Sequence, residues 1–432
     1  MLKKIAFHTL GCKLNFSETS TLARLFNPDF FEHSDFNEES DYYVINTCLV
    51  TEKAERKCRD VIKKTHNRFP KGKIIVVGCY AQLKAQELSE MPGVSLVLGN
   101  AEKFDLVKFV EEAEKEPKNK AFSCDISEAR FAHSYSVGDR TRSFLKIQDG
   151  CDYKCAYCTI PLARGNSRNP AITEIVDEAK IIALKGVKEI ILTGVNIGDF
   201  GKSTGENFYR LLSELNEKVD IPRIRISSIE PNLVTREIIE LVAKSDKIMP
   251  HFHIPLQAAS DKVLKLMQRR YLRKVFEDVV KEIISEMPLA SVGSDVIVGF
   301  PGETDEDFME GLDFLKNQEL AYLHVFSYSR RKNTKAFDFP NQVSANDMKA
   351  RSNLLHELSA KKTIAFFEKN MGTEHTVLFE NRKSGNELHG FTDNYIKVYA
   401  PFDEKLKNNI RTVVLTKIKD ENCMWGGKIR EC

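Results

Sequence analysis

The sequence predicts an α/β protein in three parts: a parallel α/β domain at the N-terminus, a partial (β/α) barrel, and a small all-β barrel at the C-terminus. Three observations support this prediction. Short apolar runs alternate with helical patterns through most of the chain, which is typical of parallel sheets. A charged stretch with little periodicity interrupts the alternation over residues 111–140. After Pro340, a long helical segment is followed by short strand-like runs broken by turn-forming residues.

The composition is that of a soluble protein with more than one domain. A chain of 432 residues is too long to fold around a single hydrophobic core, so two or three domains are expected. Hydrophobic residues make up 42% and charged residues 29%, and no apolar run is long enough to cross a bilayer. The N-terminal run resembles a first strand rather than a signal peptide, so we expect a cytoplasmic protein with no membrane partner. A net charge of +2 neither requires nor excludes nucleic acid.

Three cysteines end three apolar runs of the N-terminal domain, which we place at residues 1–112. The runs and their cysteines are Lys4–Thr9 before Cys12, Tyr42–Asn46 before Cys48, and Lys73–Val77 before Cys79. Ligands collect beyond the carboxyl ends of parallel strands, so these thiols are expected at one edge of a sheet. Ten cysteines in a reducing compartment indicate metal or redox chemistry rather than disulfides. The alternative is three unrelated buried thiols.

The second part of the chain, residues 141–370, follows a linker that we place at residues 113–140. It repeats βα units, which indicate a full or partial barrel with catalytic groups at the carboxyl ends of its strands. The expected strands are Ser143–Gln148, Glu189–Leu192, Arg223–Ser227, His251–Ile254, Ser294–Val298 and Leu323–Tyr328. Residues 371–432 contain only short strand-like runs, which predict the small C-terminal barrel.

The segment Cys151-Asp-Tyr-Lys-Cys155-Ala-Tyr-Cys158 follows the first strand of the barrel region directly. Three thiolates in one tight loop can hold three irons of a 4Fe–4S cluster and leave the fourth iron open to an outside ligand. A structural zinc site is the alternative. Zinc favours four closed ligands, and no cysteine or histidine follows Cys158 at a suitable spacing.

This motif, at this place in a βα array, resembles the radical-SAM superfamily. The resemblance implies that S-adenosylmethionine (SAM) binds the open iron and that one electron cleaves it to methionine and a 5′-deoxyadenosyl radical. Two further segments fit: Leu192–Asn196 resembles the methionine-binding turn, and Val296–Glu303 is a strand with a glycine turn suited to close approach of the adenine. The residues expected on this basis to contact SAM are Thr193, Gly194, Ser228, Glu230, Gly299 and Gly302.

The complete pattern resembles the methylthiotransferase family, in which a three-cysteine domain precedes a radical-SAM core and a C-terminal TRAM barrel. The resemblance implies two 4Fe–4S clusters, an auxiliary one on the N-terminal triad and a radical-SAM one on the core triad: Cys12, Cys48 and Cys79, and Cys151, Cys155 and Cys158. It implies two SAM molecules per turnover, one to methylate sulfur at the auxiliary cluster and one to yield the radical that removes hydrogen from C2 of adenine. No catalytic side chain is expected beyond the cluster ligands, because an aromatic C–H has no acidic proton.

Four segments resemble the family members that act on N6-threonylcarbamoyladenosine at position 37 of tRNA: Thr9–Asn15, Leu192–Gly198, Arg225–Pro231 and Met267–Tyr271. The alternatives are sister enzymes that act on isopentenyladenosine or on a ribosomal-protein aspartate. An alternative of another class is a non-catalytic iron–sulfur protein that binds RNA. The implied partners are the anticodon stem-loop of tRNA and an electron donor such as flavodoxin or ferredoxin.

Local groups of basic residues are the expected contacts to RNA phosphates. They are Arg164 and Arg168 in the core and Arg382 and Lys383 in the TRAM barrel, although charge groups are more often solvated faces. An arginine is expected to pair with the threonyl carboxylate, because a planar guanidinium binds it bidentately. Arg168 competes for that role with binding the carboxylate of SAM. Four cysteines are expected to be spare thiols: Cys58, Cys124, Cys423 and Cys432.

Overall fold

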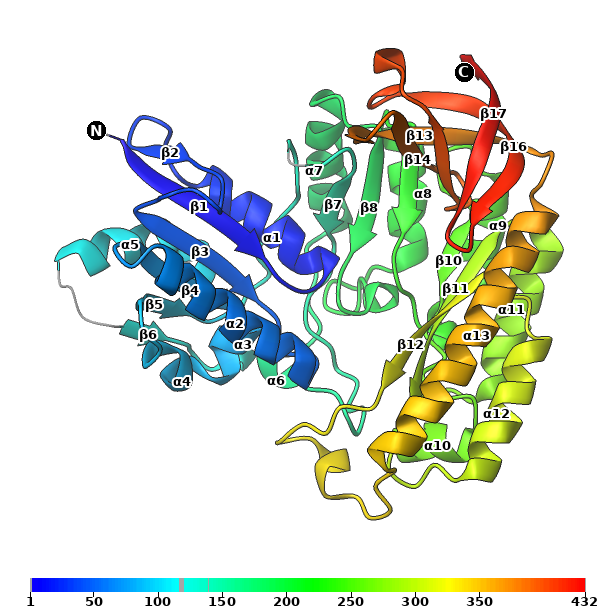
Figure 1. Ribbon diagram of the computed structural model, residues 1–432, viewed down its shortest axis with the longest axis horizontal. Helices are drawn as coiled ribbons and strands as arrows, with labels where there is room; N and C mark the ends of the chain where they lie inside the picture. The colour runs from blue at the N-terminus through cyan, green and yellow to red at the C-terminus, as the bar shows by residue number, and fades with distance from the viewer. Residues whose placement is uncertain (1, 116–119, 139, 432) are drawn as a thin grey trace.

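The computed structural model describes residues 2–115, 120–138 and 140–431. Its three parts follow the chain from blue to red (Figure 1): an N-terminal domain, a core, and a closed C-terminal barrel. The long helix α13 (Ala345–Lys369) runs along the core and leads into the C-terminal barrel. The predicted α/β architecture in three parts is therefore confirmed. Among the described helices, none combines the length and the apolar character needed to span a bilayer.

The N-terminal domain is a six-stranded parallel sheet in the order β2-β1-β3-β4-β5-β6. Its strands are β1 (Lys3–Thr9), β2 (Phe31–His33), β3 (Tyr42–Thr47), β4 (Lys73–Gly78), β5 (Val94–Leu98) and β6 (Lys120–Phe122). Every residue of β3 is buried, because helices cover both faces of the sheet. Those helices are α1 (Lys13–Arg24), α2 (Glu52–Arg68), α3 (Cys79–Leu83), α4 (Ala85–Ser89) and α5 (Leu106–Lys115). Strand β6 extends this sheet into the stretch expected to be a linker.

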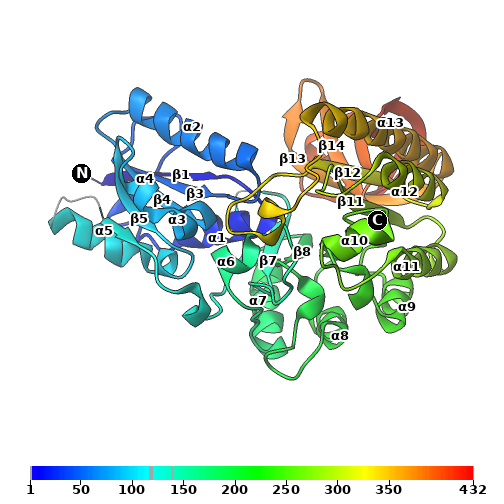
Figure 2. The same cartoon turned by 90° about the horizontal axis from the view of Figure 1, so that it is seen from below.

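The core is a partial barrel made of two three-stranded parallel sheets, β7-β8-β9 and β10-β11-β12. Parallel bridges from Ile224 to Ile248 and from Ser228 to His253 connect the two sheets. The strands are β7 (Ser143–Lys146), β8 (Glu189–Thr193), β9 (Arg223–Ile226), β10 (His251–His253), β11 (Ser291–Val298) and β12 (Tyr322–Ser327). Helices line the outside of the barrel (Figure 2): α7 (Ile172–Leu184), α8 (Phe208–Lys218), α9 (Arg236–Lys244), α11 (Arg273–Glu286) and α12 (Asp305–Asn317).

The C-terminal barrel closes in the order β13-β14-β15-β17-β16. Its strands are β13 (Glu374–Ser384), β14 (Glu387–Thr392), β15 (Lys397–Pro401), β16 (Ile410–Asp420) and β17 (Cys423–Glu431). Parallel pairing of β15 with β17 completes the closure, so the sheet has no free edge. Helix α13 begins after Ser344, whose hydroxyl accepts from the Asp347 amide, and Gly372 follows its end with a φ of +81°.

Candidate active site between the two cysteine triads

The N-terminal triad consists of Cys12, Cys48 and Cys79, which follow the neighbouring strands β1, β3 and β4. The loops touch, because a Cβ added to Gly11 would lie 2.8 Å from the Cβ of Cys48 and 3.2 Å from its Sγ. Burial, and then the thiols of Cys79 and Cys12, raise the pKa of Cys48 to about 12. The fold therefore brings the three thiols together at the carboxyl edge of the sheet.

The core triad lies in the loop between β7 and the short helix α6 (Ile160–Arg164). Each of its sulfur atoms accepts a hydrogen bond from the protein. The amides of Tyr153 and Ile160 donate to the Sγ atoms of Cys151 and Cys158, both at 3.4 Å. Arg269 on the loop after α10 (Asp261–Leu266) donates from Nη1 to the Sγ of Cys155 at 3.0 Å. Donors at every sulfur stabilise thiolates and tune any cluster bound to them.

The thiols of the core triad are protonated in the absence of a bound metal. Burial raises the pKa of Cys151 to about 11 and that of Cys158 to about 12. The free thiols are therefore neutral at physiological pH, and a cationic centre must bind them to make them thiolates.

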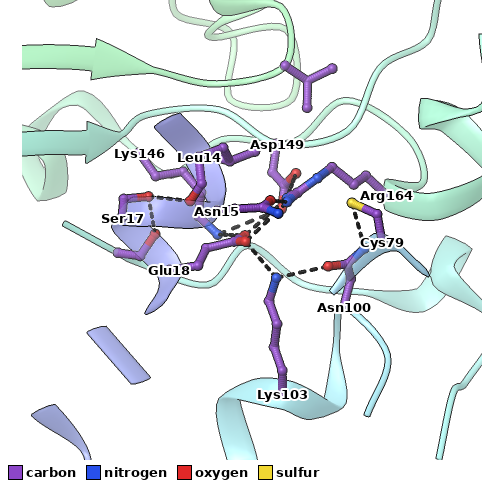
Figure 3. A network of polar contacts seen from close by, with 12 residues as sticks. Leu14, Asn15, Ser17, Glu18, Cys79, Asn100, Lys103, Lys146, Asp149 and Arg164 are labelled. Carbon is purple, nitrogen blue, oxygen red and sulfur yellow. Dashed lines mark hydrogen bonds and ion pairs between the residues drawn. The ribbon is translucent and has the colours of Figure 1, made fainter. Parts of the chain in front are cut away.

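A buried ion-pair network joins the N-terminal domain to the core through Glu18, Arg164 and Asp149 (Figure 3). Arg164, at the end of α6, donates from Nη1 to Glu18 Oε1 at 3.0 Å and to Asp149 Oδ1 at 2.9 Å. Its Nη2 donates to the Asn15 side chain at 2.9 Å. Asn15 and Glu18 both lie on α1, which begins directly after Cys12. The network therefore ties the segment after Cys12 to the helix after Cys158.

Glu18 is the centre of this network. Its side chain is fully buried and also accepts from Lys103 at 2.6 Å and from Lys146 at 3.4 Å. Burial alone would raise the pKa of Glu18, but Arg164, Lys103 and Lys146 hold it well below its usual value. Asn100 adds a contact to the N-terminal triad, because its Nδ2 donates to Cys79 Sγ at 3.6 Å.

The structure places the two arginines expected to contact substrate inside this network. Arg164 is 1% exposed, and both of its terminal nitrogens bind groups of the protein. Arg168 pairs with Asp149 Oδ2 at 3.0 Å and donates to the main-chain oxygen of Arg164. A buried carboxylate such as Asp149 requires cations, which is why these arginines turn inward. Arg382 and Lys383 lie on β13, and their side chains are outside the described part of the structure.

The residues expected to contact SAM follow the carboxyl ends of β8, β9 and β11. Thr193 is buried, and a Cβ on Gly194 would lie 2.9 Å from the Gln148 main-chain oxygen. Ser228 is exposed, whereas Glu230 forms an ion pair with Arg269 beside Cys155. The SAM contacts expected of these four residues stay predictions. Glu230 contacts the core triad indirectly, because its partner Arg269 donates to Cys155.

The two glycines after β11 have a structural role that the sequence did not reveal. The Gly299 amide donates to Glu303 Oε2 at 2.7 Å, and a Cβ at Gly299 would lie 2.1 Å from Met348 Cγ of α13. Gly302 adopts a φ of +87°. Close packing against α13 therefore requires glycine at Gly299 whether or not adenine binds there.

The C-terminal barrel docks on the core through two arginines of β9. Arg223 donates to the main-chain oxygen of Phe391 at 3.0 Å, and Arg225 donates to that of Asp393 at 2.8 Å. Between β14 and β15, Tyr395 adopts a φ of +72° and stacks on His251 of β10 with 4.3 Å between ring centroids. The turn before β15 thus contacts β9 and β10 of the core.

Comparisons with known proteins agree with this geometry. Residues 145–315 match the radical SAM superfamily, and residues 4–99 match the uncharacterized protein family UPF0004. The threonylcarbamoyladenosine tRNA methylthiotransferase MtaB of Aquifex aeolicus is 40% identical, over 95% of this chain and 100% of that protein. MtaB of Bacillus subtilis is also 40% identical, over 96% and 94%.

A second type of relative is less similar. The tRNA-2-methylthio-N(6)-dimethylallyladenosine synthase of Natranaerobius thermophilus is 34% identical, over 96% of this chain and 94% of that protein. Among solved structures, the radical S-adenosylmethionine methyltransferase TsrM from Kitasatospora setae gives a TM-score of 0.54 at 14% identity, over 78% of this chain and 77% of that chain. This last similarity concerns the fold alone.

Proposed function

The chain belongs to the radical-SAM tRNA methylthiotransferases, and from this we propose that it converts N6-threonylcarbamoyladenosine at position 37 of tRNA to the 2-methylthio derivative. The observation that supports the proposal is the contact of Arg164, on the helix that follows the core triad, with Asn15 and Glu18 on the helix that follows Cys12. The choice of substrate is supported by sequence identity, which is 40% to two enzymes named for threonylcarbamoyladenosine and 34% to one named for dimethylallyladenosine.

We propose that each triad holds one 4Fe–4S cluster, so that the N-terminal domain supplies an auxiliary site and the core supplies the radical-SAM site. When bound, the clusters and two SAM molecules would supply the electron, the radical and the sulfur that functionalisation of an aromatic C–H requires. The protein itself contributes burial of Cys48 and Cys79 and hydrogen bonds to the sulfurs of the core triad. It also contributes the contacts of Arg164 that join α6 to α1.

The partners we propose are the anticodon stem-loop of tRNA and a cytoplasmic electron donor such as flavodoxin or ferredoxin. The C-terminal barrel offers a surface suited to RNA. On it, the Lys419 ammonium lies 3.9 Å from the ring centroid of Tyr399 and 4.4 Å from that of Trp425. Aromatic rings beside cations stack bases and attract phosphates.

The proposal is tested by anaerobic reaction of the reduced protein with SAM and either of two RNA stem-loops. One carries threonylcarbamoyladenosine and the other carries isopentenyladenosine, and both are digested to nucleosides for mass spectrometry. We expect the 2-methylthio nucleoside from the first RNA only. Modification of the second RNA instead would favour the sister enzyme. Absence of 5′-deoxyadenosine with either RNA would favour a non-catalytic protein.

The hydrogen bond from Arg269 to Cys155 gives a prediction for the proposed radical-SAM cluster. Arg269→Met removes a cation beside Cys155 and leaves the Glu230 carboxylate unpaired, so the surroundings become more negative and the reduced cluster is disfavoured. We expect the midpoint potential to fall by on the order of tens of millivolts. A redox titration followed by electron paramagnetic resonance measures it, with the exposed Arg236→Met as the control. An unchanged potential would refute the prediction.

A further inference from the structure

Three cations meet where the three parts of the chain join, and we call them the cation cluster: Lys13, Arg142 and Arg225. Lys13 directly follows Cys12 and begins α1, Arg142 precedes β7, and Arg225 lies on β9. All three lower the pKa of Tyr395 in the C-terminal barrel. Burial would raise the pKa of that phenol, but Arg142, Lys13 and Arg225 together bring it below its usual value. The cluster thus combines residues of the N-terminal domain, the core and the C-terminal barrel.

The members of the cluster differ in how fully the protein satisfies them. Arg225 is fully engaged, because its Nε and Nη2 bind Glu189 at 2.9 and 3.2 Å and its Nη1 binds a main-chain oxygen. Arg142 uses Nη2 on Glu380 at 2.9 Å, and its guanidinium also interacts with the Tyr395 hydroxyl. Its Nη1 is buried, and among the described residues no partner meets the geometry of a hydrogen bond to it. In the same part of the structure, the Lys13 ammonium forms no hydrogen bond or ion pair.

The local charge balance is positive. The cation cluster and the neighbouring Arg223 face two carboxylates, those of Glu189 and Glu380. A third carboxylate, that of Asp393, lies near Arg223 but already accepts from His375 Nδ1 at 2.7 Å. An unpaired buried donor is costly, so the buried Nη1 of Arg142 favours an anionic ligand, and the half-buried Lys13 adds a second positive charge.

Two aromatic side chains lie beside the unsatisfied cations. Tyr395 stacks on His251, and the guanidinium carbon of Arg142 lies 6.0 Å from the Tyr395 ring centroid. His251 is 3% exposed; its Nε2 bonds the Tyr322 hydroxyl at 3.0 Å, and its Nδ1 is buried without a partner among the described residues. Tyr395 also stacks on Phe391, with 5.0 Å between ring centroids, so both faces of its ring are covered by the protein. These rings therefore line the site, and the Nδ1 of His251 leaves an unused polar atom next to the positive charge.

We infer that Lys13 and Arg142 bind the carboxylate of the threonylcarbamoyl group, an inference that rests on the proposed function. Lys13 is suited to this role because it is the residue next to Cys12, so the anionic end of the base modification would lie close to the N-terminal triad. Arg142, which precedes β7 of the core, contributes its Nη1. Arg225 is a positioning residue that holds Glu189 and the turn containing Tyr395. An RNA phosphate is also an anion and could bind the same cations. The experiment below distinguishes the threonyl carboxylate from an RNA phosphate.

The test uses two RNA stem-loops that differ only in the threonyl group, which is a carboxylate in one and the primary amide in the other. Wild-type protein is expected to bind the carboxylate form about ten- to a hundredfold more tightly, as for hydrogen bonds to a charged group. Lys13→Gln and Arg142→Gln should each lose most of that preference and bind the amide form as wild type does. Lys13→Arg should retain it. Lys64→Gln, an exposed lysine on α2, is the matched control.

Equal weakening of both RNAs by Lys13→Gln and Arg142→Gln would show a phosphate site and overturn the inference. Full retention of the preference in both variants would also overturn it. Lys13 adjoins Cys12, so iron content is measured for each variant to show that the N-terminal triad is intact. Arg142→Gln tests the same carboxylate site with a residue that does not adjoin a cysteine of the triad. If wild type methylthiolates neither RNA, the proposed function itself fails. If wild type methylthiolates the carboxylate RNA and the variants still bind it more tightly than the amide RNA, only this inference fails.

Discussion

Replacement of Cys12, Cys48 and Cys79 together by alanine is expected to abolish methylthio insertion while SAM cleavage continues. The core triad lies on a different segment and has its own hydrogen-bond donors, the amides of Tyr153 and Ile160 among them. Loss of the N-terminal thiols therefore removes the proposed sulfur-carrying site without removing the site that binds SAM. We expect the methylthio nucleoside to fall below detection.

Both products are measured in one reaction: 5′-deoxyadenosine reports SAM cleavage, and the methylthio nucleoside reports insertion. Cys124→Ala serves as the control, because Cys124 is exposed and belongs to neither triad. Circular dichroism establishes that the triple variant is folded. Continued methylthio formation in the triple variant would remove the N-terminal triad from the reaction. Loss of 5′-deoxyadenosine from a folded protein would show that the two triads are not independent.

Glu18→Ala is expected to lower the free energy of unfolding by about 3–5 kcal/mol, the usual cost of removing one partner from a buried ion pair. The Glu18 side chain is fully buried and is the shared partner of Lys103, Lys146 and Arg164. Without it, three cations remain in a buried site where, in the described part of the chain, Asp149 is the carboxylate that still pairs with Lys146 and Arg164. The N-terminal domain should loosen from the core as a result.

Denaturant unfolding of wild type and Glu18→Ala under the same conditions measures this change. Glu52→Ala is the matched control: its carboxylate lies 4.0 Å from Arg56 and both side chains are 71% exposed, so a change below about 0.5 kcal/mol is expected. A loss below about 1 kcal/mol for Glu18→Ala would contradict the central place of Glu18 in the network.

The stabilisation by Glu18 also depends on pH. Its pKa in the folded protein lies well below the usual 4.5, so its contribution is complete above pH 4.5 and decreases as the pH falls toward the folded value. Wild type should therefore lose more stability on acidification than Glu18→Ala does.

The fold was largely predictable because apolar runs in parallel sheets coincide with strands. The expected run Glu189–Leu192 became β8 (Glu189–Thr193), and Tyr42–Asn46 became β3 (Tyr42–Thr47). Strand β6 was missed because three residues, Lys120–Phe122, carry too little periodicity to distinguish a strand from a linker.

The parts of the site that the sequence predicted are those where metal binding requires cysteines at a characteristic spacing. Three cysteines within eight residues indicate a metal centre by themselves, and strand ends indicated where the second triad would gather. The role of Glu18 was not predictable, because its partner Lys103 is 85 residues away and Arg164 is 146 residues away. For the same reason, the sequence did not reveal the protein partners of Arg164 and Arg168, and their expected substrate contacts stay predictions. Only the fold reveals the buried carboxylates that they neutralise.

The central claim is that two iron–sulfur clusters, one from each triad, serve a single reaction. Iron analysis of the anaerobically reconstituted protein tests it most directly, because the two sites share no ligand. We predict about eight iron atoms per chain, four for each cluster. A value of about four, with the radical-SAM signal intact, would mean that Cys12, Cys48 and Cys79 hold no cluster and would contradict the claim.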